Sequence, residues 1–185
     1  MAETGALVLL IVVLAVAGLW DWRTRLVPNW LTYPAMVLGV VWWGMWGWLG
    51  REVDRGVIES LVGLGSGLIP FAVIFAAGGL GGGDVKLMGA VGALSAHWQC
   101  VLAGAFYAFV IGALMAVILI IRHGLIRQTL VRIFQAALAG AARTKVEEPA
   151  DSPRVPFGMA IAFGAALAGL EVLAGLPTPW ATFIG

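Results

Sequence analysis

Apolar residues occur along this chain in long, almost unbroken blocks. A helix that spans a bilayer needs about 20 predominantly apolar residues, with a range of about 17–25. Six such blocks lie at residues 5–20, 30–49, 57–79, 85–96, 101–121 and 155–176. Four of them reach the spanning length, and the first falls slightly short of it. The pattern predicts an all-α polytopic membrane protein with about six transmembrane helices, forming a single membrane-embedded domain over residues 1–185.

The fourth block, residues 85–96, is much shorter than the others. About a dozen residues of α-helix cover only about 18 Å at 1.5 Å per residue. We interpret this block as a short helix that begins inside the membrane. A re-entrant segment is the alternative.

The positions of Lys and Arg predict the orientation of the chain. If the N-terminus lies outside and six spans alternate, the outer loops hold only Arg51 and Arg55. The inner side then holds nine basic residues, namely Arg23, Arg25, Lys86, Arg122, Arg127, Arg132, Arg143, Lys145 and Arg154. Short cytoplasmic loops carry such an excess of basic residues. Adding or removing one span breaks the pattern, so we expect an N-out, C-out protein.

Two segments have a second interpretation. Residues 15–17, Ala-Val-Ala, resemble a signal-peptide cleavage site, but the first six residues lack Lys and Arg and include Glu3, which disfavours a signal peptide. The long cytoplasmic loop, about residues 122–154, opens with apolar residues mixed with arginines over residues 121–142. That part is compatible with an amphipathic helix on the membrane surface or with an extension of the fifth span.

Composition narrows the function classes. Hydrophobic residues make up 61% of the chain and charged residues 11%, against about 25% charged in average soluble domains. A net charge of +1 offers no general attraction to nucleic acid. The single cysteine, Cys100, excludes an intramolecular disulfide and a cysteine-based zinc site. A soluble domain, a disordered chain and a nucleic-acid-binding protein are therefore excluded. The 26 glycines include Gly63 and Gly67, a GxxxG pair that could pack two helices closely.

Two acidic residues lie where a membrane protein rarely places them without a function. Asp21 is at the inner end of the first block, and Asp84 is at the inner start of the fourth. The expected topology puts both on the cytoplasmic side. Two close carboxylates can share a proton, so that one acts as a base toward water and the other as an acid, as in aspartic proteases. Simpler interpretations are that Asp84 caps a helix N-terminus and that Asp21 pairs with Arg23 or Arg25.

The residues around each aspartate form a recognisable motif. Asp84 follows three glycines, at positions 81–83, which remove side-chain bulk and let an extended substrate backbone approach. Asp21 is followed by the run VPNWLT at residues 27–32, and a PFG run stands at residues 156–158. With GGGDVKL at residues 81–87, these runs make the chain resemble the type IV prepilin peptidases, polytopic aspartic proteases of the GxGD type.

The resemblance implies an enzyme of the bacterial inner membrane that cleaves the leader peptide of prepilins on the cytoplasmic side. In that family the two motif aspartates are the catalytic dyad, which corresponds here to Asp21 and Asp84. No metal or other cofactor is implied. The chain lacks the paired CxxC motifs of the larger bifunctional members, so N-methyltransferase activity is not expected. It is similar to the compact, peptidase-only members that serve tight-adherence (Flp-type) pili, which implies an Flp-like prepilin and the lipid bilayer as partners.

Five neighbouring residues are candidates for substrate binding or support, namely Gly81, Gly83, Lys86, Asn29 and Pro28. Lys86 could steer lipid phosphates or tune the dyad, or it could simply be a positive-inside anchor. Asn29 could hydrogen-bond near the site, although capping of the second helix alone would account for it.

Two other classes of function remain open. A small proton-coupled transporter would use Asp21 and Asp84 as a proton relay, but it predicts acidic residues deeper in the spans and inverted repeats. A noncatalytic membrane subunit of a pilus or secretion machine would tolerate the loss of either aspartate. Replacing each aspartate with Asn distinguishes these classes from a peptidase.

Overall fold

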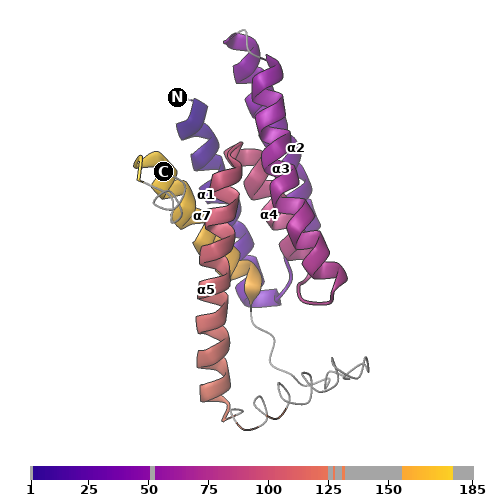
Figure 1. The fold of residues 1–185 in the computed structure, drawn as a ribbon, viewed down its shortest axis with the longest axis vertical. Coiled ribbons are helices and arrows are strands. Elements are labelled where there is room, and N and C mark those ends of the chain that lie inside the picture. The colour runs from indigo at the N-terminus through magenta and orange to yellow at the C-terminus, as the bar shows by residue number, and fades with distance from the viewer. Residues whose placement is uncertain (1, 51–52, 125–126, 128–130, 132–155, 177–185) are drawn as a thin grey trace. The chain divides into compact units, whose positions relative to one another are not determined.

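The computed structural model describes residues 2–50, 53–124, 127, 131 and 156–176. All regular structure within these residues is helical. Six helices are described (Figure 1), with the bounds α1 Ala2–Thr24, α2 Asn29–Leu49, α3 Val53–Ala76, α4 Gly82–Ser95, α5 Trp98–Arg122 and α7 Phe157–Leu173. Each coincides with one of the six apolar blocks, so the predicted all-α class is confirmed.

Three of the described helices are long and apolar enough to cross a membrane, over Glu3–Thr24, Gly56–Ala76 and Trp98–Arg122. A shorter apolar helix covers Phe157–Val172. Helix α2 has 21 residues but is not one of these three. The chain is therefore a helical membrane protein. Six spans and an N-out, C-out topology stay predictions.

The chain divides into two compact units. The first comprises Met1–Ile111 and Pro156–Gly185, and the second is Gly112–Val155. Both predicted catalytic aspartates belong to the first unit. The segment predicted as an amphipathic helix or an extension of the fifth span, residues 121–142, lies almost entirely outside the described residues.

Helix α4 lies at the centre of the first unit. It packs against α1, α2, α3 and α7, and a continuous run of its residues, from Leu87 to Leu94, is buried. Its 14 residues give a length of about 21 Å at 1.5 Å per residue. The fourth block is therefore a short, continuous helix covered by its neighbours on every side, which explains why it is apolar without an amphipathic pattern.

Helices α3 and α4 approach each other through glycines. A Cβ atom on Gly63 would lie 2.2 Å from the Gly92 carbonyl oxygen, and one on Gly67 would lie 2.2 Å from the Met88 carbonyl oxygen. Both distances are far below a van der Waals contact, so the backbones meet where no side chain fits. The buried Ser60 hydroxyl donates to the Ala93 carbonyl oxygen at 2.8 Å across the same interface. The predicted role of the GxxxG pair in helix packing is confirmed.

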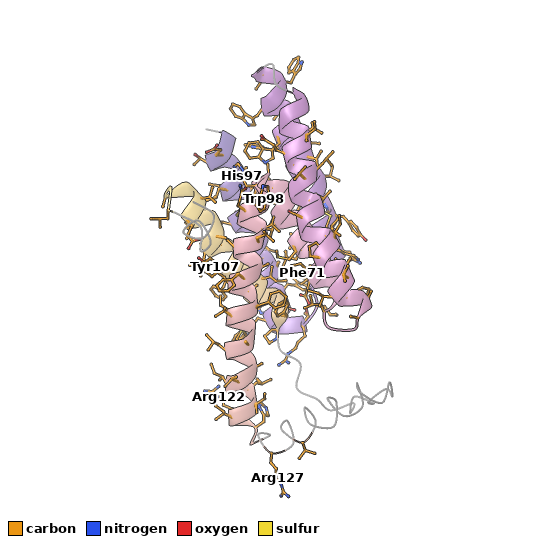
Figure 2. The ribbon with its side chains drawn as sticks, viewed as in Figure 1. Phe71, His97, Trp98, Tyr107, Arg122 and Arg127 are labelled. Carbon is orange, nitrogen blue, oxygen red and sulfur yellow. The ribbon has the colours of Figure 1, made fainter. Side chains whose placement is uncertain are left out.

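Helix α7 packs against α1, so two helices from opposite ends of the sequence are neighbours in the first unit. Aromatic rings connect the start of α7 to α5 and α3. The ring centroid of Phe157 lies 5.5 Å from that of Phe109, at a tilt, and the Phe109 ring stacks on Phe71 of α3 at 5.9 Å (Figure 2). The first turn of α7 also reaches the last turns of α1, through the hydrogen bond between Met159 and Asp21.

Candidate active site

Asp21 lies in the last turns of α1 and is buried, with 4% of its surface exposed. Its carboxylate oxygen Oδ2 accepts a hydrogen bond from the backbone N–H of Met159, at 3.0 Å. Met159 is in the first turn of α7, where N–H groups have no partner inside the helix. The Asp21 carboxylate therefore accepts a hydrogen bond from an N–H group that has no acceptor within α7.

Asp21 also experiences the charge of Arg25. Arg25 follows α1 with a left-handed backbone conformation, at φ 56°, that turns the chain out of the helix. The predicted pairing of Asp21 with an arginine thus has an electrostatic basis, while the hydrogen bond itself comes from α7.

Asp84 lies in the first turn of α4. Its Oδ2 accepts a hydrogen bond from the backbone N–H of Gly81, at 3.3 Å. Gly81, rather than Asp84, is the N-cap of α4, so the interpretation of Asp84 as the N-cap is wrong. Asp84 instead occupies the third helical position, where an acidic side chain can reach back to the N-cap N–H.

The structure brings the two aspartates together. The Asp21 and Asp84 carboxyl groups are close enough to interact electrostatically. Val27, in the connection between α1 and α2, packs against the first turns of α4 and α7. A Cβ atom on Gly83 would be 3.0 Å from the Cβ of Val27, and one on Gly158 would be 2.7 Å from its Cγ2. The end of α1 and the starts of α4 and α7 therefore meet near Val27.

The supporting residues Asn29 and Lys86 contact each other. The Lys86 Nζ atom donates to Asn29 Oδ1 at 2.8 Å and lies 5.0 Å above the ring centre of Tyr33. Asn29 does not cap α2, because Pro28 is the N-cap and its carbonyl oxygen accepts the N–H groups of Leu31 and Thr32. The capping interpretation of Asn29 is therefore wrong. The contact ties the first turn of α2 to the turn of α4 that carries Asp84.

This tie predicts a measurable coupling between Lys86 and Asn29. A hydrogen bond from a charged group contributes about 1.5–3 kcal/mol when shielded, and less when exposed. We expect the loss of stability in a Lys86→Met, Asn29→Ala double variant to be smaller than the sum of the two single losses, by about 0.5–1.5 kcal/mol. Unfolding in detergent micelles measures this double-mutant cycle. Additive losses would show that the two side chains do not interact.

The glycines before Asp84 also have structural reasons. Gly83 leaves room for Val27, and a Cβ atom on Gly81 would lie 3.1 Å from Asp84 Oδ2. Their predicted role toward a substrate backbone stays a prediction.

Val27, Gly158 and Met159 are contributors that sequence reasoning missed as site residues. The PFG run at residues 156–158 pointed to the start of α7. The hydrogen bond from Met159, however, comes from a backbone N–H, which nearly every residue type has, so the sequence could not single it out. Among the described residues, no group of three or more His, Cys, Asp or Glu side chains could hold a metal ion.

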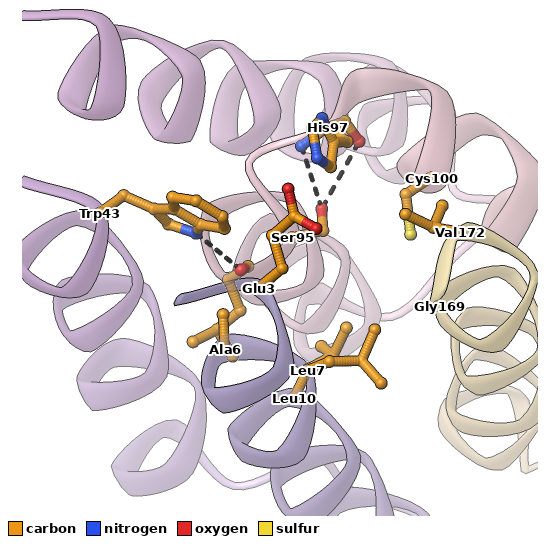
Figure 3. A pocket seen from close by; sticks show the side chains of 11 residues that line it. Glu3, Ala6, Leu7, Leu10, Trp43, Ser95, His97, Cys100, Gly169 and Val172 are labelled. Atoms are coloured by element: carbon orange, nitrogen blue, oxygen red, sulfur yellow. Dashed lines mark hydrogen bonds between the residues drawn. The ribbon is translucent and has the colours of Figure 1, made fainter. Parts of the chain in front are cut away.

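A small pocket lies away from the aspartates. Its lining comprises Glu3, Ala6, Leu7, Leu10, Trp43, Leu94, Ser95, His97, Cys100, Gly169 and Val172 (Figure 3). The Trp43 indole N–H donates to the Leu94 carbonyl oxygen at 2.8 Å, and the Ser95 hydroxyl bonds the His97 backbone. Apart from Glu3, His97 and Cys100, the rest of the lining is apolar, and neither aspartate of the candidate site belongs to it.

The fold and the site define a helical membrane protein with two buried or half-buried carboxyl groups, at the ends of two helices, that lie within range of an electrostatic interaction. The model of the type IV leader peptidase family matches residues 8–117, which is more than half of the chain, and the chain belongs to this family. Membership implies peptidase activity on a prepilin-type substrate. The matched range contains Asp21 and Asp84 and ends before α7. Searches of curated proteins and of solved structures give no significant match.

Proposed function

We propose that the protein is an aspartic endopeptidase of the bacterial inner membrane that removes the short leader from Flp-like prepilins at the cytoplasmic face. The observation that carries the proposal is that Asp21 and Asp84 come within range of an electrostatic interaction, while each belongs to one of the two motifs shared with GxGD peptidases. The positive-inside pattern supports a cytoplasmic position for both residues.

The two carboxyl groups share the work of hydrolysis. One, ionised, removes a proton from a water molecule as its oxygen attacks the scissile carbonyl carbon. The other, protonated, gives its proton to the carbonyl oxygen. Collapse of the tetrahedral intermediate breaks the C–N bond, and the leaving amine receives a proton from the dyad. Because the two groups interact, they titrate as a pair.

Backbone hydrogen bonds hold each carboxylate in an orientation that suits acid–base catalysis. Met159 N–H binds Oδ2 of Asp21, and Gly81 N–H binds Oδ2 of Asp84. One oxygen of each group is thereby fixed by backbone, and the second oxygen can face water and substrate. Rigid backbone donors keep the two groups oriented without a further side chain.

The proposal is tested with the purified full-length protein and an Flp-like prepilin in detergent. We expect removal of the leader, seen as a gel shift, with a new N-terminus at the leader junction in the mass spectrum. Cleavage should persist in EDTA, because the proposed mechanism uses no metal, and should fail when the Gly that ends the leader is replaced by a bulky residue.

Four results would contradict the proposal. Inhibition by EDTA would indicate a metallopeptidase, and a cut elsewhere in the pilin would refute leader specificity. Absence of cleavage for prepilins of both the Flp-like and the larger type IV classes would favour a transporter or a noncatalytic subunit. Methylation of the new N-terminus would refute a peptidase-only enzyme.

A further inference from the structure

The start of α7 contacts the candidate site although it lies outside the part of the chain that the family model matches. The Met159 N–H donates to Asp21 Oδ2 at 3.0 Å. The backbone N–H of Gly158 also interacts favourably with the ionised form of this carboxylate. Both groups are in the first turn of a 17-residue helix. The N-terminus of a helix carries a partial positive charge and open donors, which favour a carboxylate.

No space remains for a side chain at position 158. A Cβ atom there would lie 2.9 Å from Cγ and 3.0 Å from Oδ2 of Asp21, and 2.7 Å from Cγ2 of Val27. Val27 has little room to withdraw, because its other side packs against Gly83 at the start of α4. A methyl group at position 158 would therefore displace the Asp21 carboxylate.

Helix α7 has little room to move away from the Asp21 carboxylate. The Phe157 ring packs at a tilt against the Phe109 ring, and one turn further along α7 a Cβ atom on Gly18 of α1 would already lie 3.0 Å from the Cβ of Ala162. Helix α7 is thus held against α5 at the site and against α1 one turn beyond it. The carboxylate is the part that moves.

We propose that Gly158 is a positioning residue: its missing side chain, together with the Met159 N–H that follows, fixes the position of the Asp21 carboxylate relative to Asp84. This inference rests on the proposed aspartic mechanism. It assigns a role in the reaction to a glycine and a backbone N–H that touch Asp21 rather than the substrate. A carboxylate moved by about 1 Å loses on the order of 100-fold in rate through misalignment.

The test compares Gly158→Ala with Gly169→Ala in the full-length protein. Both replace a glycine of α7, but a Cβ atom on Gly169 would make only an ordinary contact, 3.4 Å from the Leu7 side chain. With a purified prepilin, we expect Gly158→Ala to lower kcat on the order of 100-fold and to leave KM within about twofold of the wild-type value. Gly169→Ala should retain the wild-type kcat and KM. A purely structural role would lower the yield of folded protein and leave the kcat of the folded fraction unchanged.

A second pair of variants addresses the hydrogen bond if Gly158→Ala does not fold. Met159→Pro removes the N–H, and a proline in the first helical turn breaks no hydrogen bond within the helix. Met159→Ala loses the same side chain and keeps the N–H. We expect kcat of Met159→Pro to be at least tenfold below that of Met159→Ala, which corresponds to about 1.4 kcal/mol, a modest value for a hydrogen bond to a charged group.

The outcomes separate this inference from the proposed function. If Asp21→Asn is inactive while Gly158→Ala keeps the wild-type kcat, or the two Met159 variants have equal kcat, the positioning role is refuted and the aspartic mechanism stands. If Asp21→Asn itself cleaves prepilin, the proposed mechanism fails, and the positioning role fails with it.

Discussion

Replacing either Asp21 or Asp84 with Asn is expected to abolish leader cleavage. The amide oxygen of Asn can still accept the N–H of Met159 or Gly81, so each variant keeps the hydrogen bond that holds the native side chain. What is lost is the ability to take up and release a proton. Acid and base catalysis each contribute about 10²–10⁴-fold, so we expect the initial rate of cleavage to fall at least about 10³-fold.

The matched control is Glu3→Gln. It makes the same carboxylate-to-amide change in α1, at a residue that lines the pocket away from the dyad. Its cleavage rate should equal that of the wild type. Equal amounts of membrane-inserted protein, measured by immunoblot, would show that the Asn variants lost chemistry rather than folding. Appreciable cleavage by either Asn variant would refute the dyad.

The second large effect concerns stability rather than chemistry. Gly63→Ala and Gly67→Ala each force a methyl group against a carbonyl oxygen of α4, at a starting distance of 2.2 Å. Because α4 is surrounded by its neighbours, it has no direction in which to withdraw. Overpacking of this kind costs about 1–3 kcal/mol and at times more. We expect both variants to lose much of their folded population in thermal or SDS unfolding.

Gly65→Ala provides the internal comparison, since it lies on the same helix between the two. Its Cβ atom would meet only the end of the Ile69 side chain, at 3.8 Å. In a helix interior, Ala is favoured over Gly by about 0.8–1.0 kcal/mol. Gly65→Ala should therefore be as stable as the wild type or slightly more stable. If all three variants unfolded alike, close packing of α3 on α4 would not explain the glycines.

The elements of the fold were largely predictable because hydropathy marks each helix of a membrane protein. The first and last residues of each helix were less predictable. Helix α1 extends from Ala2 to Thr24, beyond the apolar block at residues 5–20, since polar residues continue a helix once it is formed. Helix α4 begins at Gly82 rather than at residue 85. Glycine predicts a loop locally, but the Asp84 side chain satisfies the Gly81 N–H and stabilises the first turn.

The aspartates of the candidate site were predictable, and their partners were not. A carboxylate beside a membrane span is costly, so residue type alone singles out Asp21 and Asp84. The N–H of Met159 belongs to every residue type except proline, and its role depends on α7 lying against α1. Asn29 illustrates the opposite error. After Pro28, Asn is a good capping residue, but Pro28 itself ends the extended segment, at φ −75° and ψ 136°, and the Asn29 side chain is left to bind Lys86.

The pairing of the first helix with the last has a consequence for biosynthesis. Asp21 and its hydrogen-bond donor Met159 are separated by 138 positions in the chain. At translation rates of about 5–20 residues per second, the donor is made roughly 7–28 s after the acid. During that interval the nascent chain can hold both aspartates in the membrane without the helix end that orients the first. We therefore expect the proposed peptidase to reach its full activity only after helix α7 has been inserted.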